Sequence, residues 1–176
     1  LSLHDALPIL DVFYRLIDID YRNPNYHYES GLVLQHLKDS TSQNRFRNAF
    51  DLDSTHQKAI FQIAKYHLIK RQHSVVDKYV DIGLNSYANN KELIRLKSQN
   101  SYWKGDYEDA IIRFEKLIAL NESSQFVHEK LSICYDRSYK PQKAIEHQLL
   151  ALEFEPKNGN NLFKLGQLYQ RISDYK

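Results

Sequence analysis

Residues 125–158 read QFVHEKLSICYDRSYKPQKAIEHQLLALEFEPKN, and this stretch has counterparts at a fixed distance along the chain. Small residues recur in steps of 34 positions, at Ala64, Ser98, Ser132 and Gly166. The same step relates Leu131 to Leu165 and Tyr135 to Tyr169. A constant period of this length is typical of a solenoid in which one helical unit is repeated.

Each unit contains two segments with helical periodicity. In residues 91–124 the second segment carries an apolar stripe, made of Tyr107, Ala110, Ile111, Phe114, Leu117 and Ile118. This spacing of three and four residues fits an amphipathic helix and does not fit a strand. Gly105 can adopt positive φ and Asp106 can cap a helix, so a tight turn precedes this segment. Pro141 suits the first turn of the next such helix. Helices are therefore predicted to begin near Tyr107 and Pro141.

The sequence of these units resembles that of the tetratricopeptide-repeat family. The family pattern has Leu, a small residue and Tyr in the first helix of each unit, and Ala and Pro in the second. The match is fullest at Leu131, Ser132, Tyr135, Ala144, Ala151 and Pro156. Residues 91–124 depart from the pattern at Lys97 and Glu122, which stand where the family has Leu and Pro.

The resemblance implies an all-α fold, a right-handed α-solenoid of stacked antiparallel helix hairpins. We expect about nine helices from residue 10 onward and no strands. The units are expected, in chain order, as the second helix of an incomplete upstream repeat at 10–22, a degenerate repeat 1 at 23–56, repeat 2 at 57–90, repeat 3 at 91–124, repeat 4 at 125–158 and a truncated repeat 5 at 159–176.

The two ends of the chain carry a separate expectation. Residues 1–9 resemble one reading frame of a common sequencing adapter and are expected to be a non-native scar. The sequence contains no Met. We therefore expect a piece of a longer protein whose native start is missing, and the sequence leaves the cellular compartment open.

Composition excludes several classes of protein. Hydrophobic residues make up 42% of the chain and charged residues 26%, which is ordinary for a globular domain. The formal charge of +2 gives no reason to expect a nucleic-acid partner. No apolar run is long enough to span a bilayer, so no membrane partner is expected. Cys134 is the only cysteine, which excludes an internal disulfide.

Candidate catalytic residues are few and poorly arranged. His67 and His73 are six positions apart, which is not the spacing that places two metal ligands on one helix face. Asp18 and Asp20 lack the Gly and Glu of a calcium loop. Cys134 lies among the apolar residues of a predicted helix and is interpreted as a packing residue. The sequence therefore predicts no catalytic residue, no metal and no cofactor, and hence a protein that is not an enzyme.

The resemblance also implies where a partner would bind. In this family the first helices line the concave wall of the solenoid and hold peptide segments. Twelve residues match wall positions, namely Phe61, Lys65, Leu68, Arg95, Gln99, Tyr102, Glu129, Ile133, Asp136, Phe163, Gln167 and Gln170. Aromatic and Arg side chains often carry interface energy, and amide groups can pair with a peptide backbone. The alternative is that these residues are only a solvated inner face, with Phe61 and Phe163 packed between hairpins.

One subtype of the family is not expected. Members that grip an acidic chaperone tail resemble one another in a set of Lys, Asn and Arg on consecutive first helices. This chain lacks the Asn residues, and Glu129 would repel a carboxylate.

The predicted function is a non-catalytic protein–protein interaction module that binds a peptide or partner segment on the concave face. One alternative is a regulatory repeat region of a larger enzyme or signalling protein. A less favoured alternative is an RNA-binding helical repeat, since Phe61, Arg95, Glu129 and Phe163 show no recurring base-reading residue. The apolar stripe of the last predicted helix, at 160–171, has no second helix to cover it. We therefore also expect self-association or fraying at this end.

Overall fold

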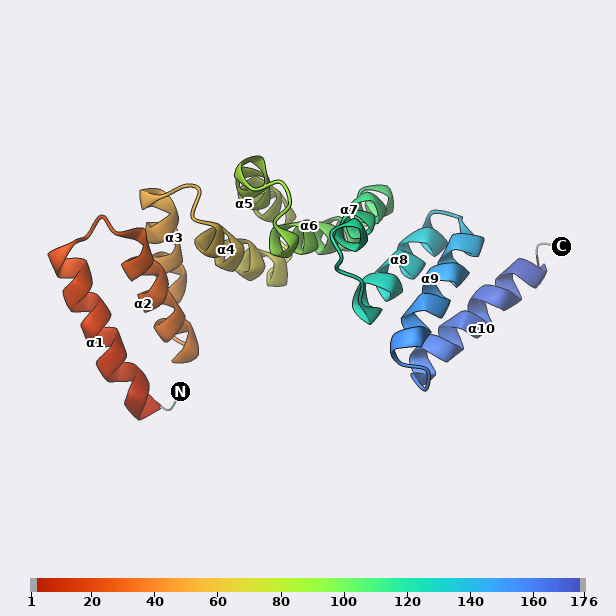
Figure 1. Ribbon diagram of the computed structural model, residues 1–176, viewed down its shortest axis with the longest axis horizontal. Coiled ribbons are helices and arrows are strands. Elements are labelled where there is room, and N and C mark those ends of the chain that lie inside the picture. Colours follow the sequence, from red (N-terminus) through yellow and green to blue (C-terminus); the bar gives the residue numbers. More distant parts are fainter. Residues whose placement is uncertain (1–2, 175–176) are drawn as a thin grey trace. The chain divides into compact units, whose positions relative to one another are not determined.

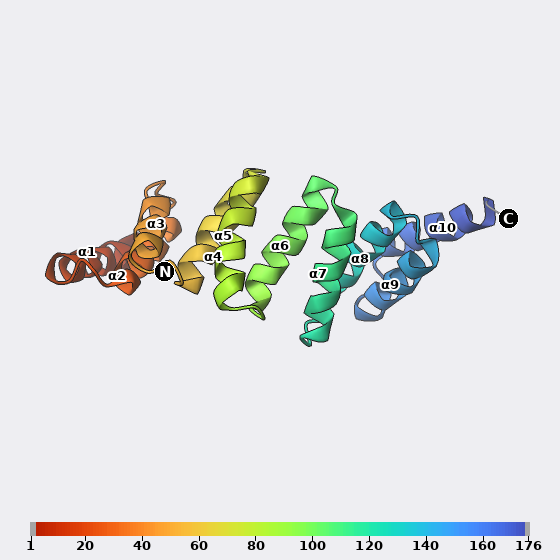
Figure 2. The same cartoon turned by 90° about the horizontal axis from the view of Figure 1, so that it is seen from above.

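The computed structural model describes residues 3–174, and within this range it contains ten helices and no strand (Figures 1 and 2). The helices are α1 (Leu3–Ile19), α2 (Pro24–His36), α3 (Ser42–Leu52), α4 (Gln57–Ile69), α5 (His73–Ser86), α6 (Lys91–Lys104), α7 (Tyr107–Ala119), α8 (Gln125–Arg137), α9 (Pro141–Phe154) and α10 (Gly159–Asp174). The all-α prediction is confirmed. The helices form two compact units, which divide between Ala88 and Asn89 and are described separately below.

The first unit contains α1 to α5. The helices α2 and α3 pack against one another, as do α4 and α5, and α1 packs on α2. Ala6 and Leu10 of α1 are buried against Val33 and Leu34 of α2. This packing explains why α1 extends back to residue 3. The described helices number ten, one more than the expected number of about nine, although the extension of α1 adds residues and not a helix. The origin of residues 1–9 stays a prediction.

Close packing in this unit depends on Gly31. A Cβ placed on Gly31 would lie 2.7 Å from an atom of the Phe46 ring. Phe46 is fully buried in a cluster with Tyr28, Ala49 and Ile63. The absence of a side chain at Gly31 therefore lets α3 approach α2.

The second unit contains α6 to α10. The pairs α6 with α7 and α8 with α9 form hairpins, α7 packs on α8, and α10 packs on α9. Ser98 and Ser132 are fully buried, like Ala64 in the first unit. Gly166 differs, since it is exposed and no atom lies within 4 Å of a Cβ placed on it. A larger side chain would therefore fit at Gly166, because no described helix covers that side of α10.

Side-chain caps set most of the helix starts, as the turn chemistry predicts. The helix α7 begins at Tyr107 and α9 at Pro141, at the predicted positions. The Asp106 carboxylate accepts a hydrogen bond from the Asp109 backbone N–H at 3.2 Å. Asn90 caps α6 in the same way.

The turn inside each hairpin has a left-handed residue. These residues are Lys38, Arg71, Gly105 and Tyr139, with φ between 57° and 80°. They follow one another in steps of 33, 34 and 34 residues, so the turn repeats with the helices. Only Gly105 has the residue type that takes this conformation without strain.

Candidate partner-binding face on the first helices

The predicted wall residues lie on α4 in the first unit and on α6, α8 and α10 in the second. We call the side of α6, α8 and α10 that carries these residues the second-unit face. On this face, side-chain contacts link α6 to α8 and α8 to α10. The three predicted residues of α4 belong to the other unit.

On α4 the three predicted residues differ in exposure. Leu68 is 3% exposed and belongs to the core. Phe61 is half-buried, and the Lys65 ammonium lies 5.8 Å from the centre of its ring. Gln62 of α4 accepts a weak hydrogen bond from Gln35 of α2, at 3.4 Å. Phe61 and Lys65 thus remain accessible to a partner, whereas Leu68 does not.

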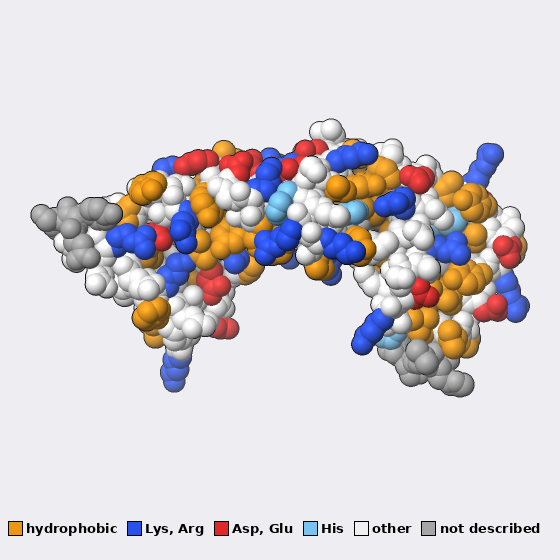
Figure 3. Space-filling view, turned by 180° about the vertical axis from the view of Figure 1, so that it is seen from behind, with side chains coloured by type: hydrophobic (Ala, Val, Ile, Leu, Met, Phe, Trp, Pro, Cys, Tyr) orange, Lys and Arg blue, Asp and Glu red, His pale blue; other side chains and the backbone are white. Residues whose placement is uncertain are grey.

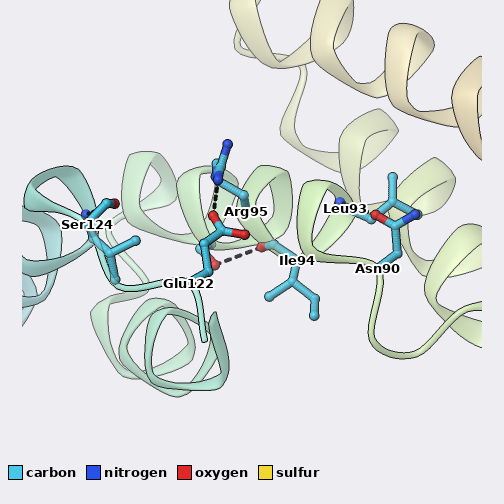
Figure 4. Close-up of polar contacts among 8 residues, drawn as sticks. Asn90, Leu93, Ile94, Arg95, Glu122 and Ser124 are labelled. Carbon is cyan, nitrogen blue, oxygen red and sulfur yellow. Dashed lines mark hydrogen bonds and ion pairs between the residues drawn. The ribbon is translucent and has the colours of Figure 1, made fainter. Parts of the chain in front are cut away.

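On α6, Arg95 forms an ion pair with Glu122 in the turn between α7 and α8 (Figure 4). The two side chains point toward each other, and Glu122 is the more buried of the pair. Glu122 is the residue that replaces the family's Pro. Its departure from the pattern therefore has a role in this chain, because it fixes the Arg95 side chain. Gln99 and Tyr102 on the same helix are half-buried.

On α8, both predicted carboxylates are engaged by α10. Glu129 accepts hydrogen bonds from the Gln125 side chain at 2.8 Å and from the Asn161 side chain at 2.6 Å. Asp136 forms an ion pair with Arg171. These contacts order α10 against α8, and Arg171 neutralises the charge of Asp136.

Two lysines that the sequence interpretation did not select also lie on this face. The Lys130 ammonium is 4.7 Å from the centre of the Tyr102 ring and 5.5 Å from that of Phe126. Burial lowers the pKa of Lys164 to about 8. The charges of Asp136 and Glu129 oppose this shift, and that of Lys130 acts in the same direction. Lys130 and Lys164 are 34 residues apart, so the repeat period is the signal that could have revealed them.

On α10 the predicted residues are open to solvent. Phe163 is 70% exposed, and Gln167 and Gln170 are exposed as well. Ile133 on α8 is half-buried. In the space-filling view, hydrophobic side chains are exposed beside Lys and Arg side chains (Figure 3). The second-unit face therefore combines an accessible aromatic ring, amide groups and cations.

Cys134, the only cysteine of the chain, is buried on α8. Burial raises the pKa of the Cys134 thiol to about 12, the opposite of what a nucleophile needs. Among residues 3–174, no three His, Cys, Asp or Glu side chains gather as metal ligands would. Within the same range, no helix combines the length and apolar character needed to cross a bilayer.

Comparison with known proteins places the fold. No protein-family model matches the chain, and no curated protein matches it in sequence. Solved structures do match. The crystal structure of YrrB, described as a TPR protein with an unusual peptide-binding site, superimposes with a TM-score of 0.82 at 14% identity, covering 92% of this chain and 84% of that one.

Two further structures show the same likeness. A thermophilic TPR protein of Thermus thermophilus gives a TM-score of 0.63 at 12% identity, over 96% of this chain and 92% of that one. MamA (residue 41 to the end) of Desulfovibrio magneticus RS-1 gives 0.74 at 17% identity, over 88% of each chain. The chain therefore has the tetratricopeptide-repeat fold, an all-α solenoid of antiparallel helix hairpins, as its sequence predicts.

Proposed function

We propose that this chain is a non-catalytic protein-interaction module that holds a segment of a partner protein on its first helices. The observation that carries the proposal is the second-unit face, where Phe163, Gln167 and Gln170 are exposed beside ordered charged side chains. An extended peptide needs both an apolar contact and groups that pair with its backbone, and this face offers both. The peptide-binding site named for YrrB supports the proposal by analogy of fold.

The proposed contact residues are the predicted wall residues without Leu68, which is buried. The proposed division into units remains 10–22, 23–56, 57–90, 91–124, 125–158 and 159–176. Nucleic acid is not a proposed partner, since the four equivalent positions Phe61, Arg95, Glu129 and Phe163 offer no common way to read a base. A regulatory role within a larger enzyme or signalling protein would use the same face.

A peptide selection tests the proposal. Random peptides displayed on phage through their C-terminal ends would be selected on the whole chain, and the selected sequences synthesised with acetylated and amidated ends. Phe163→Ala should weaken their binding at least tenfold in fluorescence anisotropy, because an exposed aromatic ring is a strong interface anchor. Tyr139→Ala is the matched control, since Tyr139 is 92% exposed but lies in the turn between α8 and α9. Equal binding to wild type and Phe163→Ala would contradict the proposal.

We also propose self-association through α10. Leu162 and Tyr169 are each 49% exposed on this helix, so apolar surface faces solvent there. Light scattering over a concentration series should show a dimer that Leu162→Glu abolishes, because a charge in the contact would have to be desolvated. A monomer at every concentration would contradict it.

A further inference from the structure

Gln148 on α9 is a polar residue at a position that is apolar elsewhere in this chain. The repeat period of 34 relates it to Phe46, Val80 and Phe114, and all four residues are fully buried. Phe114 of α7 packs against the next helix, where its ring centre is 6.2 Å from that of Phe126 on α8. Gln148 occupies the equivalent place between α9 and α10, so this junction has an amide group where the α7–α8 junction has an aromatic ring.

The amide group of Gln148 has a partner for its nitrogen but none for its oxygen. The Nε2 atom donates a hydrogen bond to the backbone carbonyl of Asn161 on α10, at 3.2 Å. The Oε1 atom is buried and has no hydrogen-bond partner among the described residues 3–174. A buried acceptor without a partner destabilises the folded state, because it has lost its hydrogen bonds to water. Opening of the α9–α10 junction would return water to this atom, so Gln148 favours the open state more than an apolar residue would.

Few side chains of α10 are buried in the second unit. Among residues 159–173, only Asn161 and Leu168 are buried. The Asn161 side chain donates a hydrogen bond to Glu129 of α8 at 2.6 Å, and Arg171 near the end of α10 forms an ion pair with α8. Water can replace such polar contacts at small net cost, whereas it cannot replace the burial of apolar surface. These contacts therefore position α10 but stabilise its packing only weakly.

We propose that Gln148 makes the α9–α10 junction a hinge, at which α10 opens as one segment while α6 to α9 stay folded. The helix α10 carries Phe163, Gln167 and Gln170 of the second-unit face, so opening would remove these residues from a partner peptide that lies across α8 and α10. The coupling between opening and binding rests on the proposed function, whereas the opening itself does not. Gln148 is thus a positioning residue, which acts on the partner through α10.

Hydrogen exchange of the free chain, followed by mass spectrometry, tests the hinge at a concentration at which light scattering shows a monomer. Amides throughout α10 should exchange at least about a hundredfold faster than the slowest amides of α8. Low urea should hardly change the α10 rate, because a local opening exposes little surface. One common rate for α8, α9 and α10 would overturn the hinge. Rates that rise steadily toward Asp174 would overturn it as well, since they indicate fraying.

Gln148→Met tests the role of the amide, because Met has a similar length but no buried acceptor to satisfy. It should slow exchange throughout α10 about tenfold, and Gln148→Leu repeats the test with a second apolar side chain. Gln142→Met is the matched control, since Gln142 is exposed on the same helix, and it should change this rate less than about twofold. If both apolar variants at 148 leave α10 exchange unchanged or accelerate it, the inference is wrong. Circular dichroism melts would confirm that each variant is folded.

A phage-selected peptide that depends on Phe163 tests the coupling to a partner. If it binds only when α10 is closed, then at about 100 times its Kd it should slow exchange of α10 about a hundredfold. A peptide that binds in fluorescence anisotropy but leaves this rate unchanged would overturn the coupling. If no such peptide is found, the proposed function and the coupling fail together, while exchange of the free chain still decides whether the α9–α10 junction is a hinge.

Discussion

The helices α8 and α10 carry the same repeat pattern, yet equivalent side chains on them have different environments. On α8, His128, Leu131, Ser132 and Tyr135 are buried by α9 and its neighbours. Their counterparts on α10, 34 residues later, are Leu162, Leu165, Gly166 and Tyr169, and Leu162 and Tyr169 are each 49% exposed. The apolar stripe of a first helix is therefore only a potential core. The second helix of the same hairpin buries this stripe, and each repeat depends on the neighbouring repeats for stability.

The largest expected difference between the two helices is at the tyrosines. Tyr135 is 2% exposed, stacks on His147 and donates a hydrogen bond to Glu115. Its replacement by Ala should lower the free energy of unfolding by about 3 to 5 kcal/mol, since it leaves a cavity. In the monomer, at concentrations below those at which the chain associates, Tyr169→Ala should cost less than about 1 kcal/mol, as for most exposed positions. Urea unfolding followed by the fluorescence of Trp103, the only Trp and a residue of α6, measures both. Equal losses in the free energy of unfolding would show that the two tyrosines are equally buried.

The next difference is in the room for a larger side chain at Ser132 and at Gly166. Ser132→Leu should overpack the α8–α9 hairpin and cost roughly 1 to 3 kcal/mol, because Ser132 is fully buried. Gly166→Leu should be neutral or stabilising, since its surroundings are open and Leu is the better helix former. Thermal melts of the two variants provide the measurement. A loss of stability for Gly166→Leu as large as that for Ser132→Leu would show that α10 is covered in solution.

A third difference depends on pH. The Nδ1 atoms of His128 and His147 are 3.0 Å apart, so one ring must donate and the other accept. Burial lowers the pKa of both imidazoles, and the charge of Glu153 opposes this for His128. For His147 the charges of His128 and Lys143 add to the effect of burial, and those of Glu146 and Glu115 oppose it. Because the unfolded chain binds protons more readily, stability is full above the unfolded pKa of about 6.5 and falls as the pH drops below it.

His128→Leu gives α8 the residue that α10 has at Leu162. This variant should show a shallower loss of stability between pH 7 and pH 5 in melts recorded across that range. Some loss should remain, because His147 is still buried in this variant. His56, which caps α4 through its Nδ1, also has a pKa lowered by burial. An unchanged pH profile would show that the His128–His147 pair does not titrate with unfolding.

The smallest expected effect is at the turn that brings α9 onto α8. Tyr139 adopts φ of 58° and is 92% exposed, so its side chain strains the backbone without contributing to packing. Tyr139→Gly should raise stability by about 0.5 to 1 kcal/mol, whereas Gly105→Ala at the equivalent turn should lower it by a similar amount. Opposite shifts in melting temperature are expected, and shifts of the same sign would contradict the turn geometry.

Local sequence signals predicted much of the fold. Asp106 and Pro141 indicate helix starts through their own chemistry, and the structure places α7 and α9 accordingly. The environment of Gly166 could not be predicted in this way, because it depends on whether another helix covers α10. Ala6 shows the same limit, since its burial comes from contact with α2.

The candidate face was predicted in part. The period of 34 placed Phe163 and Gln167 at solvent-exposed positions, but it also selected Leu68, which the core buries. The partners of Arg95 and Asp136 lie 27 and 35 residues away, and only the folded chain brings them together. The same period relates Lys130 to Lys164, but the sequence interpretation selected neither. The surroundings of Lys130, which lies over the Tyr102 ring, are known only from the folded chain.

The Arg95–Glu122 pair affects how firmly two neighbouring repeats of the second unit are held together. A proline at position 122 would restrict the backbone covalently and would be insensitive to the solvent. An ion pair holds the same junction electrostatically, and Arg95 is 46% exposed, so dissolved salt screens it. The contact between α6 and the turn before α8 therefore weakens as the ionic strength rises, and a peptide bound there as proposed would meet a less rigid surface.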